Sequence, residues 1–422
     1  MTDSTWGARA SNVVNRLGFA RAADAYAALV AASLPWSTTA TTILIVAWLV
    51  ILLPTLDVAT MRREIMTAAG GAPLILLALA ALGTLWADVS VTDRLGGLEG
   101  YLKLLFIPFL FAQFRRSPNG GWVIIGFFGS GLALLVLSWA MVLIPDWPWH
   151  GKFAGIPVKD YITQSGVFAL CAFAALRYAT DVWRNGQRRR ALMLICAAAA
   201  FIANIAYVET GRTTLVAIAV LAPLFGFRRF GWKGMAAAVV VASVLAGIAW
   251  VSSPYLRFRV TFVAEEVQRY QASHEPTSTG ARLDFWRNSL ESIAKAPIAG
   301  HGTGSIPEQL ASTVSPDTGM ASIATVNPHN EIFVAAVQLG LIGAAALFSM
   351  WISHLLLFRG NDAISWMGMV AVVQNVVGSL ANSHLSDFTQ GWIYVFAIGA
   401  LGGMVLRQGG PPPAGSLSVP AR

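Results

Sequence analysis

Long apolar segments, separated by short polar loops, restrict what this chain can fold into. About twelve of them are long enough to cross a bilayer, alone or with tilt. They cover residues 20–34, 39–56, 72–87, 99–114, 121–144, 161–180, 191–208, 213–227, 234–251, 331–358, 364–382 and 388–406. Only 12% of the residues are charged, against about 25% in soluble domains. Because backbone polar groups in lipid must be satisfied within the chain, the sequence predicts an all-α polytopic membrane protein with about twelve transmembrane helices.

Basic residues predict which ends of these segments face the cytoplasm. Alternate loops carry Arg62-Arg63, Arg115-Arg116, Arg188-Arg189-Arg190, Arg228-Arg229 and Arg359. By the positive-inside rule these loops, and with them both termini, are cytoplasmic. The net charge of +8 arises largely in these loops, so it predicts membrane topology and gives no reason to expect nucleic-acid binding.

The loop lengths divide the chain into four parts. Residues 1–251 hold about nine spans, residues 252–330 form one large outer loop, and residues 331–407 hold about three spans. Loops as long as the outer one are usually functional. Two helices are expected in it, the second capped by Ser278 or Thr279. Residues 408–422 are rich in Pro and Gly, which predicts a disordered cytoplasmic tail.

A histidine stands where this outer loop meets the next apolar run, in Asn327-Pro328-His329-Asn330-Glu331. Asn327 suits a helix N-cap and Pro328 suits the first turn, which predicts that His329 lies at a helix start. The positive end of a helix disfavours the imidazolium form, so the ring stays neutral and able to accept a proton. The alternative is a capping or interfacial histidine without a chemical role.

Three arginines in outer segments are candidate phosphate ligands. Arg212 follows Gly211 in a tight turn that opens a helix, where backbone N–H groups also favour an anion. Arg282 and Arg287 lie on the predicted loop helix, and a planar guanidinium can bind a diphosphate through two parallel hydrogen bonds. The alternatives are an arginine extended to the membrane surface and a solvated helix face.

Weaker signals occur in two other outer turns. The glycine-rich run Gly300-His301-Gly302-Thr303-Gly304 can expose backbone N–H groups as an anion nest, or can be a plain connector. Asp387, in the turn before the last span, can orient a base or bind sugar hydroxyls. No spacing fits a metal site or a nucleotide-binding P-loop, so neither a metal nor a nucleotide cofactor is expected.

Three motifs, in this order, resemble the O-antigen ligase family. They are Thr210-Gly211-Arg212-Thr213, the run from Ser278 to Arg282 continuing to Gly302, and Asn327-Pro328-His329-Asn330. The resemblance implies a GT-C-like glycosyltransferase of the bacterial inner membrane, working at its periplasmic face. It implies that Arg212 and Arg282 hold a diphosphate and that His329 activates the acceptor hydroxyl. Arg287, His301, Asp387 and Asn330 are expected only as substrate-binding or orienting residues.

The resemblance also implies the partners. The donor is a glycan on undecaprenyl diphosphate, the acceptor is a sugar of lipid A–core, and the reaction is inverting and needs no metal. Two related functions differ only in the acceptor: an O-antigen polymerase and a pilin O-oligosaccharyltransferase. A solute transporter is a fourth possibility, which the lack of ionisable residues in the middle of the predicted spans disfavours.

Overall fold

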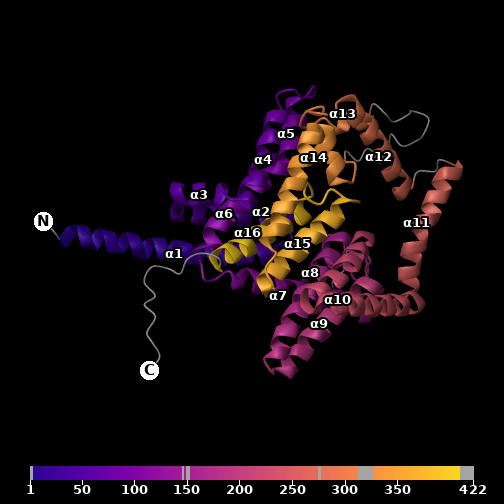
Figure 1. Cartoon of the computed structure of the whole chain (residues 1–422), viewed down its shortest axis with the longest axis horizontal. Coiled ribbons are helices and arrows are strands. Elements are labelled where there is room, and N and C mark those ends of the chain that lie inside the picture. The colour runs from indigo at the N-terminus through magenta and orange to yellow at the C-terminus, as the bar shows by residue number, and fades with distance from the viewer. Residues whose placement is uncertain (1–2, 145–146, 149–152, 274–276, 312–326, 409–422) are drawn as a thin grey trace.

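The fold is known from a computed structural model, which describes residues 3–144, 147–148, 153–273, 277–311 and 327–408 (Figure 1). These residues form sixteen α-helices and two short 3-10 helices. The α-helices are α1 (Asp3–Ser33), α2 (Thr38–Leu52), α3 (Val58–Ile65), α4 (Ala68–Gly83), α5 (Val91–Leu102), α6 (Phe106–Phe114), α7 (Gly121–Leu143), α8 (Tyr161–Arg184), α9 (Arg188–Tyr207), α10 (Arg212–Ser252), α11 (Pro254–Ser273), α12 (Ser278–Lys295), α13 (Ile306–Ala311), α14 (Glu331–Leu357), α15 (Ala363–Ser379) and α16 (Phe388–Gln408).

All twelve predicted spans fall on helical segments of the described chain, so the all-α prediction is confirmed. The predicted number of about twelve membrane crossings is not confirmed. Among the described residues, eight helices are long and apolar enough to cross a membrane, or nine if α3 and α4, which meet at 87°, form one span. The helix α15 is apolar but shorter. The predicted disordered tail lies outside the described residues, apart from Gln408.

One of these eight helices, α10, is divided in two by Gly231. Its backbone takes φ 68° and ψ −158° there, which is not helical. The two halves then approach each other so closely that a Cβ on Gly226 would lie 2.3 Å from the carbonyl oxygen of Gly234. At the far end of the second half, the Ser253 hydroxyl donates to the Ala206 carbonyl of α9. The chain therefore reverses at Gly231 and returns to the end of the molecule from which α10 starts.

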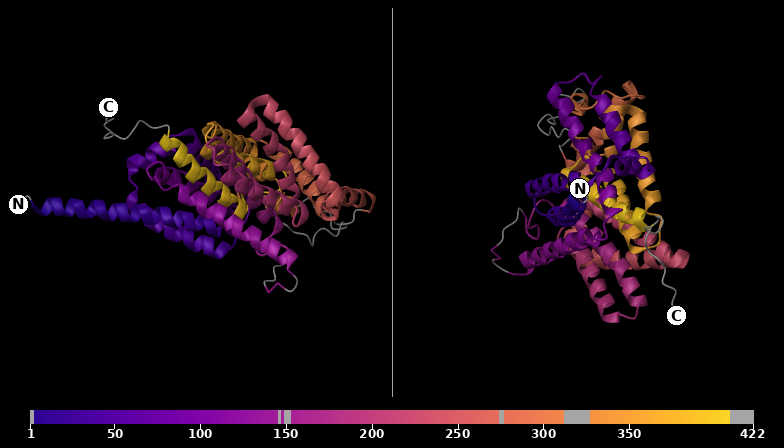
Figure 2. Two further views of the ribbon diagram at one scale, coloured as in Figure 1. Left: turned by 90° about the horizontal axis from the view of Figure 1, so that it is seen from below. Right: turned by 90° about the vertical axis from the view of Figure 1, so that its left-hand side faces the viewer.

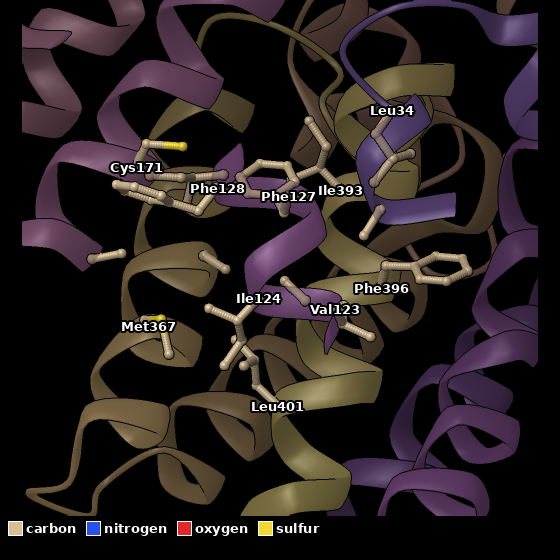
Figure 3. Close-up of a pocket in the computed structure, with 15 residues that line it drawn as sticks. Leu34, Val123, Ile124, Phe127, Phe128, Cys171, Met367, Ile393, Phe396 and Leu401 are labelled. Atoms are coloured by element: carbon tan, nitrogen blue, oxygen red, sulfur yellow. The ribbon is translucent and has the colours of Figure 1, made fainter. Parts of the chain in front are cut away.

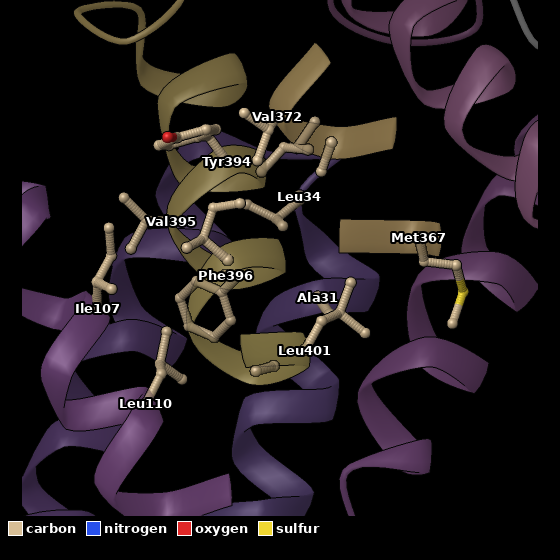
Figure 4. Close-up of a cluster of buried hydrophobic side chains, with 14 of the residues drawn as sticks. Ala31, Leu34, Ile107, Leu110, Met367, Val372, Tyr394, Val395, Phe396 and Leu401 are labelled. Atoms are coloured by element: carbon tan, nitrogen blue, oxygen red, sulfur yellow. The ribbon is translucent and has the colours of Figure 1, made fainter. Parts of the chain in front are cut away.

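A large apolar core lies where α1, α2, α6, α7, α8, α15 and α16 pack together (Figure 4). Small residues on α1, such as Ala27 and Ala31, let it lie close against α7, while its first half extends beyond the other helices (Figure 2). An apolar pocket of about 90 Å³ adjoins this core, and no charged side chain lines it (Figure 3). Leu34, Phe128, Cys171, Met367 and Phe396 are among the residues around it.

A second break lies in α14 at Gly340, where φ is 64° and ψ is −161°. The polar backbone groups that this break leaves unpaired are bound by the segment after α12. Leu341 N–H donates to the Pro297 carbonyl at 2.8 Å, and the Val337 and Gln338 carbonyls accept from His301 and Gly302. Residues 297–302 thus supply the hydrogen-bond partners that the two halves of α14 lack at the break.

Four helices begin around one loop, residues 380–387, at the same end of the molecule. Its residues contact the first turn of α10 through Asn382 and Thr213, and the start of α14 through the Leu380 carbonyl and Asn330. The helix α16 starts from this loop, and its Gln390 reaches the first turn of α8 at Ile162. Carboxylates cap α8 and α16, through Asp160 and Asp387, whereas α10 starts after Gly211 without a side-chain cap. Because a helix N-terminus carries partial positive charge, the start of α10 favours an anion.

Candidate active site

Arg212 is the first residue of α10 and is held by a glutamate of the outer loop. Its Nη1 lies 3.2 Å from Oε2 of Glu266 on α11 and 3.4 Å from the hydroxyl of Thr279 on α12. The Thr279 hydroxyl donates to the same carboxylate. The side chain of Arg212 is 25% exposed, and its Nε is buried without a partner. Part of the guanidinium therefore still has hydrogen-bonding capacity for a ligand.

Arg282 lies on α12 in the same cluster and is half-buried. Burial lowers the pKa of Arg282, and the neighbouring charges that act on it come from Tyr161, Arg212 and Glu266. Unlike Arg212, it has no hydrogen-bond or ion-pair partner among the residues that the structure describes. A guanidinium that is partly desolvated and unpaired is well suited to bind an oxyanion through its planar fork.

His329 lies next to this cluster, immediately before α14, and is half-buried. Its ring centre is 6.5 Å from that of Phe285 on α12. Burial, and then the positive charge of Arg282, lower the pKa of His329 below its usual value of 6.5. The imidazole is therefore mostly neutral at pH 7 and can accept a proton from a hydroxyl group.

The backbone around His329 differs from the sequence prediction. The N-cap of α14 is Asn330, whose side chain accepts from the N–H groups of Ile332 and Phe333, so the predicted cap at Asn327 is wrong. Asn327 instead accepts from the His329 N–H at 2.9 Å, and His329 takes φ 51°. A non-glycine residue in this left-handed region is uncommon and is often found where function requires it.

Two further contacts hold this turn in place. Trp286 Nε1 donates to the Pro328 carbonyl at 3.1 Å, which ties the turn to α12. Asn330 Nδ2 donates to the Leu380 carbonyl at 3.0 Å, which ties it to the loop at the end of α15. Asn330 therefore helps to hold His329 in place. Trp286 links the turn that contains His329 to the helix that carries Arg282. The cap of α12 is Thr277, so the predicted cap at Ser278 or Thr279 is wrong by one or two residues.

Three members of this cluster, namely Tyr161, Arg259 and Glu266, were not expected from the sequence. Arg259 on α11 lies over the ring of Tyr161 at 4.8 Å, and its Nη2 donates to the Thr210 carbonyl. Tyr161 is the first residue of α8, so a helix that precedes Arg212 by about fifty residues also reaches the site. Arg259 and Glu266 are seven residues apart, which puts them on one helical face. That spacing was the available sign that α11 faces the site.

The structure does not bring three of the predicted residues into this cluster. Arg287 is 78% exposed and pairs with Glu291 one turn along α12. His301 Nε2 contacts the Ser292 carbonyl at 2.9 Å and lines a separate cavity with Asp88 and Glu308. Asp387 accepts from the Gln390 N–H at the start of α16 and is exposed, which is a capping role.

The glycine-rich turn at Gly300–Gly304 is a packed connector, which is the second of the two alternatives that its sequence allowed. Its N–H groups are used within the protein: His301 and Gly302 donate to carbonyls of α14, Thr303 donates to Gly83, and Gly304 donates to Gln338. Gly300, Gly302 and Gly304 take φ between 66° and 93°. A Cβ on Gly302 would lie 2.4 Å from Ala87 Cα. Glycine is needed there for tight packing against the segment between α4 and α5.

Fold and site together define a polytopic helical membrane protein with a cluster of arginines and the half-buried His329 at one end. Residues 197–348 match the family model described as O-Antigen ligase, and this match confirms the resemblance to that family. The matched region contains Arg212, Arg282 and His329.

One relative from Haemophilus influenzae, described as an uncharacterized protein, is 25% identical over 186 residues. That similarity covers 41% of this chain and 46% of the relative, so the chain spans less than half of the relative's length.

Proposed function

We propose that this protein is an O-antigen ligase of the bacterial inner membrane. It would transfer O-antigen polysaccharide from undecaprenyl diphosphate to a sugar of lipid A–core at the periplasmic face. The observation that carries this proposal is the position of Arg282, which has no partner among the described residues, on the helix whose Phe285 ring lies 6.5 Å from that of the half-buried His329. A transferase that uses a diphosphate leaving group and a hydroxyl nucleophile needs a cation and a base next to each other.

The arginines would act on the donor. Arg212, Arg259 and Arg282 contribute three positive charges to the cluster, and Glu209 and Glu266 contribute two negative charges. A diphosphate would therefore meet an excess of positive charge, and Arg282 and the free part of Arg212 would donate hydrogen bonds to it as the sugar–phosphate bond breaks.

His329 would act on the acceptor. Its neutral ring takes the proton of an acceptor hydroxyl while that oxygen bonds to the anomeric carbon of the donor sugar. The bond from this carbon to the diphosphate oxygen breaks, and undecaprenyl diphosphate leaves with the electron pair. Direct displacement inverts the anomeric centre. General-base assistance of this kind is worth ~10²–10⁴ in rate.

Donor binding would itself make His329 a stronger base. The charge of Arg282 lowers the pKa of His329 in the free protein. A bound diphosphate would neutralise that charge, so the pKa of the histidine would rise toward its usual value. A base of higher pKa takes a proton more readily, which would couple acceptor activation to the presence of the donor.

The test is a reconstituted reaction with defined donor and acceptors. Purified protein, an undecaprenyl-diphosphate glycan and EDTA are mixed with lipid A–core, with a second donor molecule, or with pilin. The proposal expects a product only with lipid A–core, and loss of that product in His329→Ala at unchanged protein level in the membrane. Elongation of the donor glycan would identify a polymerase, and glycosylated pilin would identify a pilin transferase. Normal ligation by His329→Ala would exclude the histidine as the base.

A further inference from the structure

A second cluster of arginines lies at the opposite end of the helices that carry the candidate site. It surrounds a cavity of about 230 Å³ lined by Arg177, Arg184, Phe225, Arg228, Arg229, Asn361 and Trp366. Arg177 comes 16 residues after Tyr161 on α8, and Arg228 comes 16 residues after Arg212 on α10. At 1.5 Å per residue each pair is about 24 Å apart along its helix, which approaches the thickness of a membrane core.

The charges in this cavity are not balanced by the protein. Asp181 pairs with both Arg177 and Arg229, the latter at 2.7 Å. Asp362 also acts on Arg228, but its carboxylate caps α15 by accepting from the N–H groups of Ile364 and Ser365. Four arginines therefore face two carboxylates, of which one is already used as a helix cap.

The hydrogen-bonding capacity of these arginines is also only partly used. Arg228 Nη2 donates to the carbonyls of Phe358, Arg359 and Gly360 at the end of α14, and Arg177 Nη2 donates to the Asn361 carbonyl at 2.6 Å. The side chain of Arg229 is 11% exposed, and its Nε is buried without a partner in the part of the chain that the structure describes. A buried, unpaired donor beside a cationic cavity is satisfied best by an oxyanion.

Aromatic side chains lie beside the arginines of this cavity. The rings of Phe225 and Trp366 pack at 5.4 Å and form one wall of the cavity. Just beyond Arg229, the side chains of Phe230 and Trp232 are 56% and 71% exposed. Aromatic side chains exposed next to arginines are typical of the membrane–water interface. The surroundings thus fit a phosphate group that is attached to an acyl chain.

We propose that this cavity binds the phosphate group of an anionic phospholipid from the leaflet opposite the candidate active site. Basic pockets between helices bind such head groups in other membrane proteins. This inference does not depend on the proposed glycosyltransferase function. A free phosphate ion shares the ligand chemistry, and the experiment separates the two sources.

The experiment measures lipid retention by native mass spectrometry of the purified full-length protein. Phosphatidylglycerol, phosphatidylcholine and inorganic phosphate are titrated separately. The test variant is Arg184→Gln with Arg229→Gln, and the matched control is Arg189→Gln with Arg190→Gln, which removes the same charge from exposed arginines at the start of α9. Thermal unfolding in phosphatidylcholine checks that each variant is folded. If the test variant does not fold, the exposed Arg184→Gln alone replaces it.

The proposal expects phosphatidylglycerol to bind more tightly than phosphatidylcholine. It expects the test variant to weaken that binding by about ten-fold, because charge-assisted hydrogen bonds are lost, and the control variant to bind as the wild type does. Equal weakening in test and control variants would mean diffuse surface attraction and would overturn the proposal. So would equal retention of both lipids, or binding of inorganic phosphate without phosphatidylglycerol.

Discussion

The partner-free guanidinium of Arg282 leads to the most direct prediction about donor binding. Replacing it by Gln keeps a side chain of similar polarity but removes the charge and the planar fork. In the wild type this fork has no protein partner within the described chain. No internal ion pair is therefore lost in Arg282→Gln, and the variant is expected to fold normally.

The expected effect on catalysis follows from the contacts that a diphosphate would make. Two parallel N–H to oxygen bonds from one guanidinium each contribute about 1.5–3 kcal/mol when a charged group is involved. Their loss together amounts to roughly 3–6 kcal/mol, which is about 10²–10⁴ in kcat/KM. Arg282→Lys keeps the charge without the fork, so its activity is expected to lie between those of the wild type and Arg282→Gln.

The same helix supplies the control. Arg287 lies five residues later, is 78% exposed and pairs only with Glu291 at the surface. Arg287→Gln removes the same charge and is expected to retain wild-type kcat/KM in the reconstituted ligation assay. Equal losses in Arg282→Gln and Arg287→Gln, or no loss in either, would refute the assignment of Arg282 to the diphosphate.

Three further predictions concern the same end of the molecule. Arg212→Lys should lower kcat/KM for ligation by about ten-fold or more because the fork is lost, and full activity would exclude bidentate binding. The acid limb of the kcat/KM profile should lie below pH 6.5, since activity falls as neutral His329 is protonated at its lowered pKa. In Arg282→Gln that acid limb should move to higher pH, because one cause of the lowered pKa of His329 is gone. An unchanged limb would contradict the effect of Arg282 on the pKa of His329. Gly340→Ala should destabilise the protein by about 1–3 kcal/mol in a reversible unfolding experiment, because its φ is 64°, whereas Gly247→Ala, with open space around it, should be neutral or stabilising.

The helices themselves were predictable from hydropathy, since every predicted apolar segment is helical in the structure. The exact start of α14 was not predictable from hydropathy. Asn327 and Asn330 are both good N-caps, and the choice between them depends on tertiary partners, namely Trp286 for the Pro328 carbonyl and Leu380 for the Asn330 amide. The same partners hold His329 at positive φ, which local sequence does not encode.

The candidate site was predictable in part, because Arg212, Arg282 and His329 stand in recognisable motifs, and the structure brings them together. The arginines could not be ranked by sequence alone. Arg282 and Arg287 lie on one helix, and only packing shows that the first faces Tyr161 while the second faces solvent. Tyr161 was missed because the residue that makes it relevant, Arg259, contacts it from α11, about a hundred positions later in the chain.

The junction at Gly340 closes a short ring of protein around the candidate site. Along α12 the chain runs from Arg282 to Pro297, which bonds across the interruption in α14. The first half of α14 leads from there back to His329, and the bond from Trp286 to Pro328 completes the circuit. The spacing between Arg282, the proposed donor ligand, and His329, the proposed base, is therefore fixed within this ring. The distance between Arg282 and His329 would stay constant even when the surrounding helices shift in the membrane.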